Sequence, residues 1–102
     1  MMDFSSYDLR TTIRLIVLSG ESRRIDVKKG SREGAIYVRE GEISRAVAGT
    51  LLGDEAFFEI LSWKNETHTD SLNTEDMGKN VRIPTTILVD LLKGRSISTD
   101  RD

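Results

Sequence analysis

The stretch GAIYVREGEISRAVAGTLLGDEAFFEILSW, residues Gly34–Trp63, decides the fold of this 102-residue chain. Its first half holds two strand-like segments, 35–39 and 42–48. They are joined by Glu40-Gly41, where glycine can take the left-handed conformation of a short hairpin loop. Small side chains line one face of 42–48, which leaves room for a helix to approach the sheet closely. The first half therefore predicts a β-hairpin with one face suited to helix packing.

The second half of the stretch predicts an amphipathic helix. Gly53 precedes Asp54 and Glu55, and negative charge is favoured at a helix N-terminus. The apolar stripe of the helix consists of Ala56, Phe57, Ile60 and Leu61. A sheet face and the helix that covers it are thus adjacent in the sequence.

The residues before the stretch predict a helix and a strand. Apolar residues recur every three or four positions over 7–18, with Ser5 and Ser6 as candidate N-caps. The β-branched content of that segment keeps a strand over 13–18 as the competing interpretation. Segment 24–28 alternates apolar and charged residues, as a half-buried strand does.

The residues after the stretch predict a polar edge strand with a loop within 66–76 and a final helix that begins at Ile83-Pro84 and ends at Gly94. The apolar positions of this helix are Ile87, Leu88, Leu91 and Leu92. We expect a single domain over 1–94 and a flexible polar tail over 95–102. The fold class is α+β: a small, mainly antiparallel sheet of three to four strands, packed with an N-terminal, a central amphipathic and a C-terminal helix.

The amino-acid composition excludes several kinds of partner and site. Fifteen basic and seventeen acidic residues are interspersed and give a net charge of −2, which argues against a general polyanion binder. The chain has no cysteine, so disulfides and thiolate metal sites are excluded. The longest apolar run, 15–18, is too short to span a bilayer. We expect a cytoplasmic protein without a membrane partner.

The order of glycine and apolar residues in the central stretch resembles the PATAN family, a bacterial signalling domain of unknown function. The residues that carry the resemblance are Gly34, Ile36, Tyr37, Val38, Gly41, Ile43, Ala46, Gly49, Gly53, Ala56, Phe57, Ile60, Leu61 and Trp63. The resemblance implies a non-catalytic protein–protein interaction module in signal transduction. Its implied partners are a response-regulator-type protein of a two-component system or a second copy of the chain, as a homodimer.

The sequence shows no set of residues arranged for catalysis, for a metal or for a cofactor, so we assign none of these and expect no enzyme. The single histidine, His68, lies in a polar segment without neighbouring ligands and reads as a partly exposed strand residue. Asp54 and Glu55 are adjacent on a helix, so their side chains diverge.

Two off-stripe aromatic residues, Phe58 and Trp63, leave two interpretations open. They complete the core from the flanks of the helix, or they anchor a partner, because aromatic residues dominate interface energetics. With the charged hairpin residues Arg39, Glu40 and Glu42, they form the predicted partner-binding set.

The alternative function is small-ligand or nucleic-acid binding through the basic segment 23–32. Its five cations are Arg23, Arg24, Lys28, Lys29 and Arg32. No aromatic residue is interleaved to stack on bases, and strand alternation divides the cations between two faces, which argues against nucleic acid.

Overall fold

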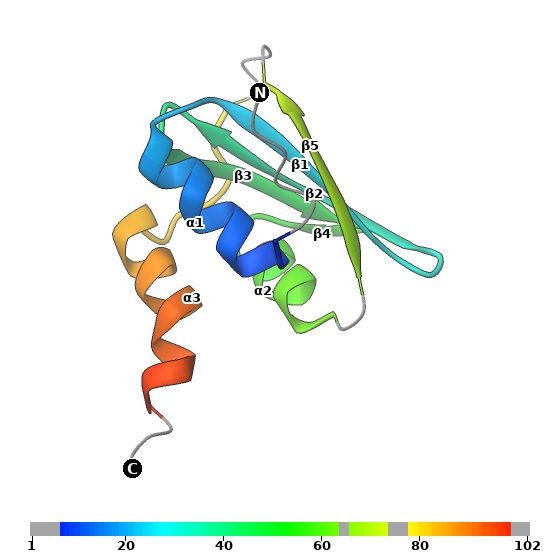
Figure 1. Ribbon diagram of the computed structural model, residues 1–102. Helices are drawn as coiled ribbons and strands as arrows, with labels where there is room; N and C mark the ends of the chain where they lie inside the picture. The colour runs from blue at the N-terminus through cyan, green and yellow to red at the C-terminus, as the bar shows by residue number, and fades with distance from the viewer. Residues whose placement is uncertain (1–6, 64–65, 74–77, 99–102) are drawn as a thin grey trace.

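The computed structural model describes residues 7–63, 66–73 and 78–98, with the side chains of the last helix described as far as Leu92. Over these residues the chain is an α+β domain, in which a five-stranded antiparallel sheet carries three helices on one side (Figure 1). The elements are α1 (Leu9–Ser19), β1 (Arg23–Lys29), β2 (Arg32–Arg39), β3 (Glu42–Ala48), β4 (Leu51–Leu52), α2 (Asp54–Ser62), β5 (Thr67–Leu72) and α3 (Thr85–Ser98). The strands lie in the order β4-β3-β2-β1-β5.

The predicted fold class is confirmed, with one strand more than expected. The extra strand is β4, whose two residues pair with the end of β3. The predicted hairpin is also confirmed: Glu40 and Gly41 have φ values of 50° and 80°. Positive φ at both central residues is what a two-residue loop needs to match the twist of its strands.

The N-terminal segment is a helix, not the competing strand, because its apolar residues at spacings of three and four are buried together. These residues are Leu9, Thr12, Ile13 and Ile16. The N-cap is Asp8, whose side chain accepts a hydrogen bond from the Thr11 amide at 3.1 Å. The expected caps, Ser5 and Ser6, lie outside the described residues and two or three positions before the observed cap.

The C-terminal half departs from expectation at one boundary. The polar edge strand is present as β5. Helix α3 continues past Gly94 to Ser98, so the expected stop at Gly94 is wrong. A glycine inside a helix costs only about 1 kcal/mol relative to alanine, which neighbouring helical residues can offset. Residues 99–102 of the expected tail lie outside the described part of the chain.

The core fills the space between the sheet and the helices. Phe57 of α2 is fully buried at its centre, among residues contributed by every helix and by β1, β2 and β3. Gly34 of β2 allows α2 to approach β2 closely, because a Cβ there would lie 2.7 Å from Ile60 Cδ1. Among the described residues, no helix is long and apolar enough to cross a membrane.

The outer edge of β3 is closed by the segment that leads into α3. Asn80 holds the backbone of Ala46 with both ends of its side-chain amide: Oδ1 accepts from Ala46 N at 2.9 Å and Nδ2 donates to Ala46 O at 3.2 Å. The Asn80 amide donates to Ser44 O at 2.9 Å, and Thr85 Oγ1 accepts from Ile43 N at 2.9 Å. Together with β4, these contacts satisfy β3 along this edge.

Candidate functional site

A groove of about 240 Å³ lies where the three helices meet. It is lined by Arg10 of α1, by Phe58, Leu61 and Ser62 of α2, and by Leu91 of α3. Its lining is mostly hydrocarbon, and the one charged group among its described lining residues is the guanidinium of Arg10. A groove of this composition suits an apolar side chain with an acidic neighbour.

Phe58 is the aromatic anchor that this groove exposes. Its ring packs edge to face against Phe57, with centroids 5.6 Å apart, and the residue remains 39% exposed. Leu91 is 45% exposed, and Ile87, one turn before it on α3, is 49% exposed. One rim of the groove is thus fixed by the core, while its apolar surface faces solvent.

Trp63, the other predicted anchor, belongs to the core. It is 8% exposed and packs in the main apolar cluster. It follows α2 as the C-cap in an extended conformation, and its indole Nε1 donates to Glu59 Oε2 at 3.0 Å. Of the two interpretations left open by the sequence, core completion describes Trp63, and solvent exposure is found only at Phe58.

The charged residues Arg39, Glu40 and Glu42 lie on the β2–β3 hairpin, apart from Phe58. A Cβ at Gly41 of this hairpin would lie 3.1 Å from Val17 O, near the C-terminal end of α1. The Phe58 groove reaches α1 at Arg10, near its other end. The structure therefore places the five predicted partner-binding residues in three separate environments.

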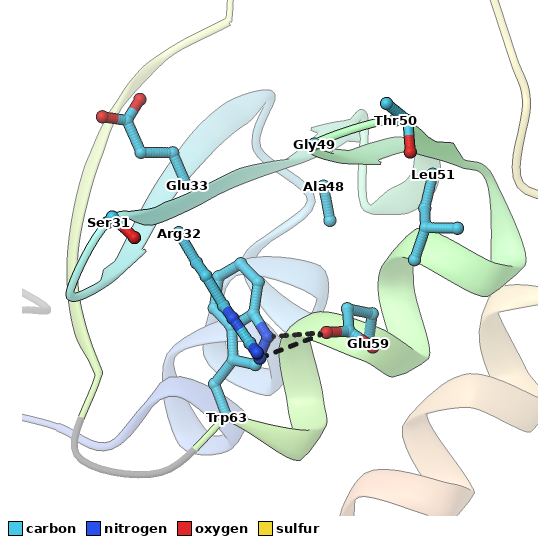
Figure 2. Close-up of a pocket in the computed structure, with 9 residues that line it drawn as sticks. All are labelled: Ser31, Arg32, Glu33, Ala48, Gly49, Thr50, Leu51, Glu59 and Trp63. Carbon is cyan, nitrogen blue, oxygen red and sulfur yellow. Dashed lines mark hydrogen bonds and ion pairs between the residues drawn. The ribbon is translucent and has the colours of Figure 1, made fainter.

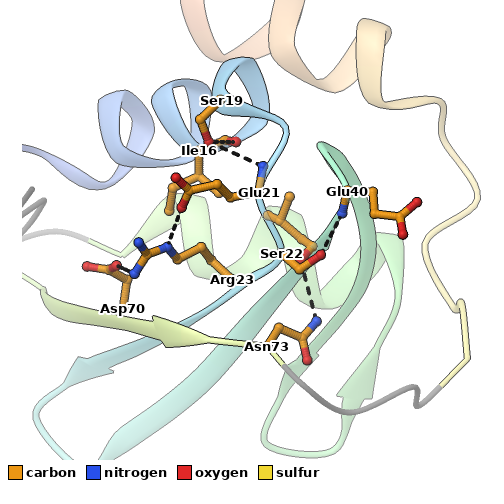
Figure 3. A network of polar contacts seen from close by, with 9 residues as sticks. Ile16, Ser19, Glu21, Ser22, Arg23, Glu40, Asp70 and Asn73 are labelled. Atoms are coloured by element: carbon orange, nitrogen blue, oxygen red, sulfur yellow. Dashed lines mark hydrogen bonds and ion pairs between the residues drawn. The ribbon is translucent and has the colours of Figure 1, made fainter. Parts of the chain in front are cut away.

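The first cation of the basic segment, Arg23, is held within a polar network at one end of β1 and β5 (Figure 3). Its Nε lies 2.8 Å from Glu21 Oε1 and its Nη1 lies 2.9 Å from Asp70 Oδ2, with only 17% of the side chain exposed. In the same network, Ser22 joins the β2–β3 hairpin by accepting from the Glu40 amide at 2.9 Å. Arg23 thus ties strands together.

The remaining cations are divided, as strand alternation predicted. Arg24 lies on the sheet face opposite the helices, paired with Asp26 at 2.9 Å and stacked over the Tyr37 ring at 5.5 Å. Lys28 is exposed and Lys29 is half-buried. Three of the five cations are paired with carboxylates, so the segment does not present one continuous basic surface.

A second hollow, of about 380 Å³, includes the last of these cations, Arg32 (Figure 2). It is bounded by the β1–β2 turn, the β3–β4 turn and α2, and its lining residues include Leu51 and Trp63. Figure 2 shows Arg32 and Trp63 directed at the same carboxylate, Glu59. Arg32 Nη1 lies 3.6 Å from Glu59 Oε2, with 64% of the Arg32 side chain exposed. This exposed pair is weak and can exchange.

His68 and Asp54, which the sequence offered as candidates for a catalytic or metal-binding role, make hydrogen bonds that join elements of the fold. His68 Nε2 lies 3.0 Å from Thr12 Oγ1, linking β5 to α1. Asp54 Oδ1 accepts from the amides of Arg82 and Ile83 at 3.0 and 3.2 Å. In the described ranges, no group of three or more His, Cys, Asp or Glu residues is placed to hold a metal ion.

Two residues that line these candidate sites were not predicted as site residues from the sequence. Leu91 was assigned to the apolar stripe of the last helix, yet it lines the groove instead. The available signal was the doubling of apolar residues at 87–88 and 91–92, which is wider than one buried stripe needs. Glu59, which accepts from Trp63 and pairs with Arg32 in the second hollow, looks in the sequence like any other carboxylate on a helix surface.

The comparisons with known proteins give no relative against which to test the PATAN resemblance. No family model matches the chain. No curated protein and no solved structure matches it either.

Proposed function

We propose that this chain is a non-catalytic protein–protein interaction module of bacterial signal transduction, acting in the cytoplasm. Its partner is a response-regulator-type protein or a second copy of the chain. The observation that carries the proposal is the groove between the helices, where Phe58 and Leu91 expose apolar surface around a concave floor. Concave apolar surface with an aromatic anchor is typical of protein-binding sites.

The geometry of the groove describes the partner's contact. An apolar side chain entering it would bury surface of Phe58, Leu61 and Leu91 at about 25 cal/mol per Å². Arg10 on the rim favours a carboxylate beside that side chain. The PATAN-like glycine and apolar pattern of the central stretch supports the same class of function.

The test compares variants that differ only in where an apolar side chain is made acidic. Phe58→Asp and Leu91→Asp place a charge in the groove, and Leu18→Asp places one on exposed α1 surface, where Leu18 is 78% exposed. We expect the two groove variants to lose binding to a purified receiver-domain partner, while Leu18→Asp retains it.

Folding is checked in parallel by thermal unfolding. Groove variants that bind every partner as the original chain does, with unchanged thermal midpoints, would remove the groove as the contact surface.

A second candidate function, small-ligand binding, is favoured by the hollow at Arg32, whose volume lies within the usual range for ligand pockets. It retains one cation of segment 23–32, whereas the division of the other cations disfavours nucleic acid. A ligand that raises the thermal midpoint of the original chain and of Lys28→Met, but not of Arg32→Met, would support this function. An equal shift in all three proteins would contradict it.

A further inference from the structure

The two edges of the sheet differ in whether other backbone or side-chain groups cover them. On the β3 side, β4, Asn80 and Thr85 cover the edge. On the other side β5 is the last strand and, among the described strands, pairs only with β1 (Figure 1). An uncovered edge strand is a template for pairing with another strand.

The register identifies which backbone groups of β5 face outward. The Asn73 amide donates to Ser22 O at 3.0 Å, so the pair next to the Arg23–Leu72 end of the β1–β5 ladder is hydrogen-bonded. Hydrogen-bonded pairs alternate along antiparallel strands. The backbone groups of Thr67, Thr69 and Ser71 therefore face β1, and those of His68, Asp70 and Leu72 face outward. In the described ranges, no hydrogen bond reaches these outward backbone groups.

The sequence of β5 lacks the features that protect edge strands. THTDSL contains no lysine, no proline and no glycine, and no bulge interrupts its pairing with β1. Its one inward charge, Asp70, is neutralised by Arg23 at 2.9 Å. Thr67, Thr69 and Ser71 are exposed on the face away from the helices, where hydroxyl side chains favour cross-strand pairing.

Two-fold symmetry limits how a second copy can pair with this edge. In a symmetric antiparallel pair one residue faces its own copy, and residues at equal distances on either side of it face each other. An axis at Asp70 would place two carboxylates directly opposite, which is destabilising. An axis at Thr69 instead places His68 of each copy opposite Asp70 of the other. It also places Thr67 of each copy opposite Ser71 of the other.

We propose that two copies of this chain associate along their β5 edges, antiparallel about a two-fold axis at Thr69, to form one continuous sheet. The inference rests on the proposed function only in taking a second copy as one of its partners; it assigns that contact to β5 and leaves the groove for a receiver-domain partner. The outward backbone groups of His68 and Asp70 form four hydrogen bonds across the axis. A seam of one short strand buries little surface, so the association is weak and concentration-dependent.

Cysteine cross-linking tests both the edge and the register, because the chain has no cysteine of its own. At an axis through Thr69 the two Thr69 residues form a non-hydrogen-bonded pair, with Cα atoms about 4.5 Å apart. That separation lies at the short end of the disulfide range. Thr69→Cys should therefore form a disulfide dimer on mild oxidation. Thr67→Cys, equally exposed on the same strand face, should stay monomeric because it faces Ser71.

A charge variant provides a second readout without oxidation. Thr69→Lys brings two lysines together on the axis, whereas Thr67→Lys faces a serine. We expect light scattering of the original chain and of Thr67→Lys to rise with concentration from 11.5 kDa toward twice that mass. Thr69→Lys should remain at the monomer mass with an unchanged thermal midpoint.

Each contrary outcome is decisive. Equal cross-linking of Thr69→Cys and Thr67→Cys would show random collision and overturn the proposal. A chain that self-associates without Thr69→Cys cross-linking would overturn the β5 seam while leaving the interaction function standing, with the groove as the surface. A chain that stays monomeric and does not cross-link would overturn the seam, and binding of a receiver-domain partner by the groove would remain a separate measurement.

Discussion

Replacing Gly53 by alanine should destabilise the fold far more than the same change at Gly49. The two glycines flank β4, and both have positive φ, 69° and 60°. A Cβ at Gly53 would clash with the backbone oxygen of Asn80, whereas a Cβ at Gly49 would meet nothing within 4 Å. The pair therefore separates backbone strain from steric conflict.

The expected magnitudes follow from these contacts. Gly49→Ala should cost about 1 to 2 kcal/mol, the cost of left-handed φ with a Cβ. Gly53, with ψ at −137°, lies near a region that only glycine occupies readily, at about 1 to 3 kcal/mol. Relieving the clash also moves Asn80 away from Ala46 and Ser44, and each hydrogen bond weakened adds about 1 kcal/mol. We expect a total near 3 to 5 kcal/mol.

Urea unfolding followed by tryptophan fluorescence measures this difference, since Trp63 is the only tryptophan and is buried. In thermal unfolding, Gly53→Ala should lower the Tm by roughly 10 °C or more, and Gly49→Ala by about half as much or less. Equal losses for the two variants would refute the reasoning, because they would show that the Asn80 segment yields without cost.

Three further changes test other parts of the fold by the same unfolding assay. Gly34→Ala should cost about 1 to 3 kcal/mol through overpacking against Ile60, and Ile60→Val in the same chain should recover part of that loss by removing the Cδ1 atom that a new Cβ meets; no recovery would contradict the packing argument. Asn80→Ala should cost about 2 to 3 kcal/mol, because it leaves the Ala46 amide without its side-chain acceptor, and a loss as small as that of a surface variant would contradict the edge closure. The side-chain hydrogen bond with Thr11 is the largest cause that lowers the pKa of Asp8 from its usual 3.8. The ionised Asp8 cap therefore stabilises the fold fully above pH 3.8, and this stabilisation is lost as pH falls through the lower folded pKa. Asp8→Ala should cost about 1 kcal/mol of stability near neutral pH, so the Tm difference between the original chain and this variant should shrink in acid; a constant difference would count against the assignment.

The elements around the central stretch were predictable because their signals are local. Alternation, the Glu40-Gly41 turn and the stripe of α2 each depend on residues close in sequence. β4 escaped prediction because two residues are too few to show a period. The end of α3 escaped because glycine favours a helix stop without enforcing one.

The candidate site was less predictable because exposure depends on packing between distant elements. Trp63 lies beyond the last turn of α2 in extended backbone, so helical spacing does not give its direction. Ile87, Leu88, Leu91 and Leu92 share one pattern, and the contact of α3 with α1 decides which pair is buried. Asn80 hydrogen-bonds to the edge of β3 much as a neighbouring strand would, but a single side chain produces no repeating pattern in the sequence from which this could be predicted.

The segment that leads into α3, in which Asn80 covers the β3 edge, bears on the size of any assembly formed along β5. If only the β5 edge of each protomer is free to pair, as in the proposed dimer, each protomer binds one other copy and assembly stops at two. If the β3 edge were exposed as well, each protomer would offer two edges, and pairing could continue from dimer to dimer without limit. In the proposed dimer, the segment at Asn80 would limit assembly to two copies, as well as joining α3 to the sheet.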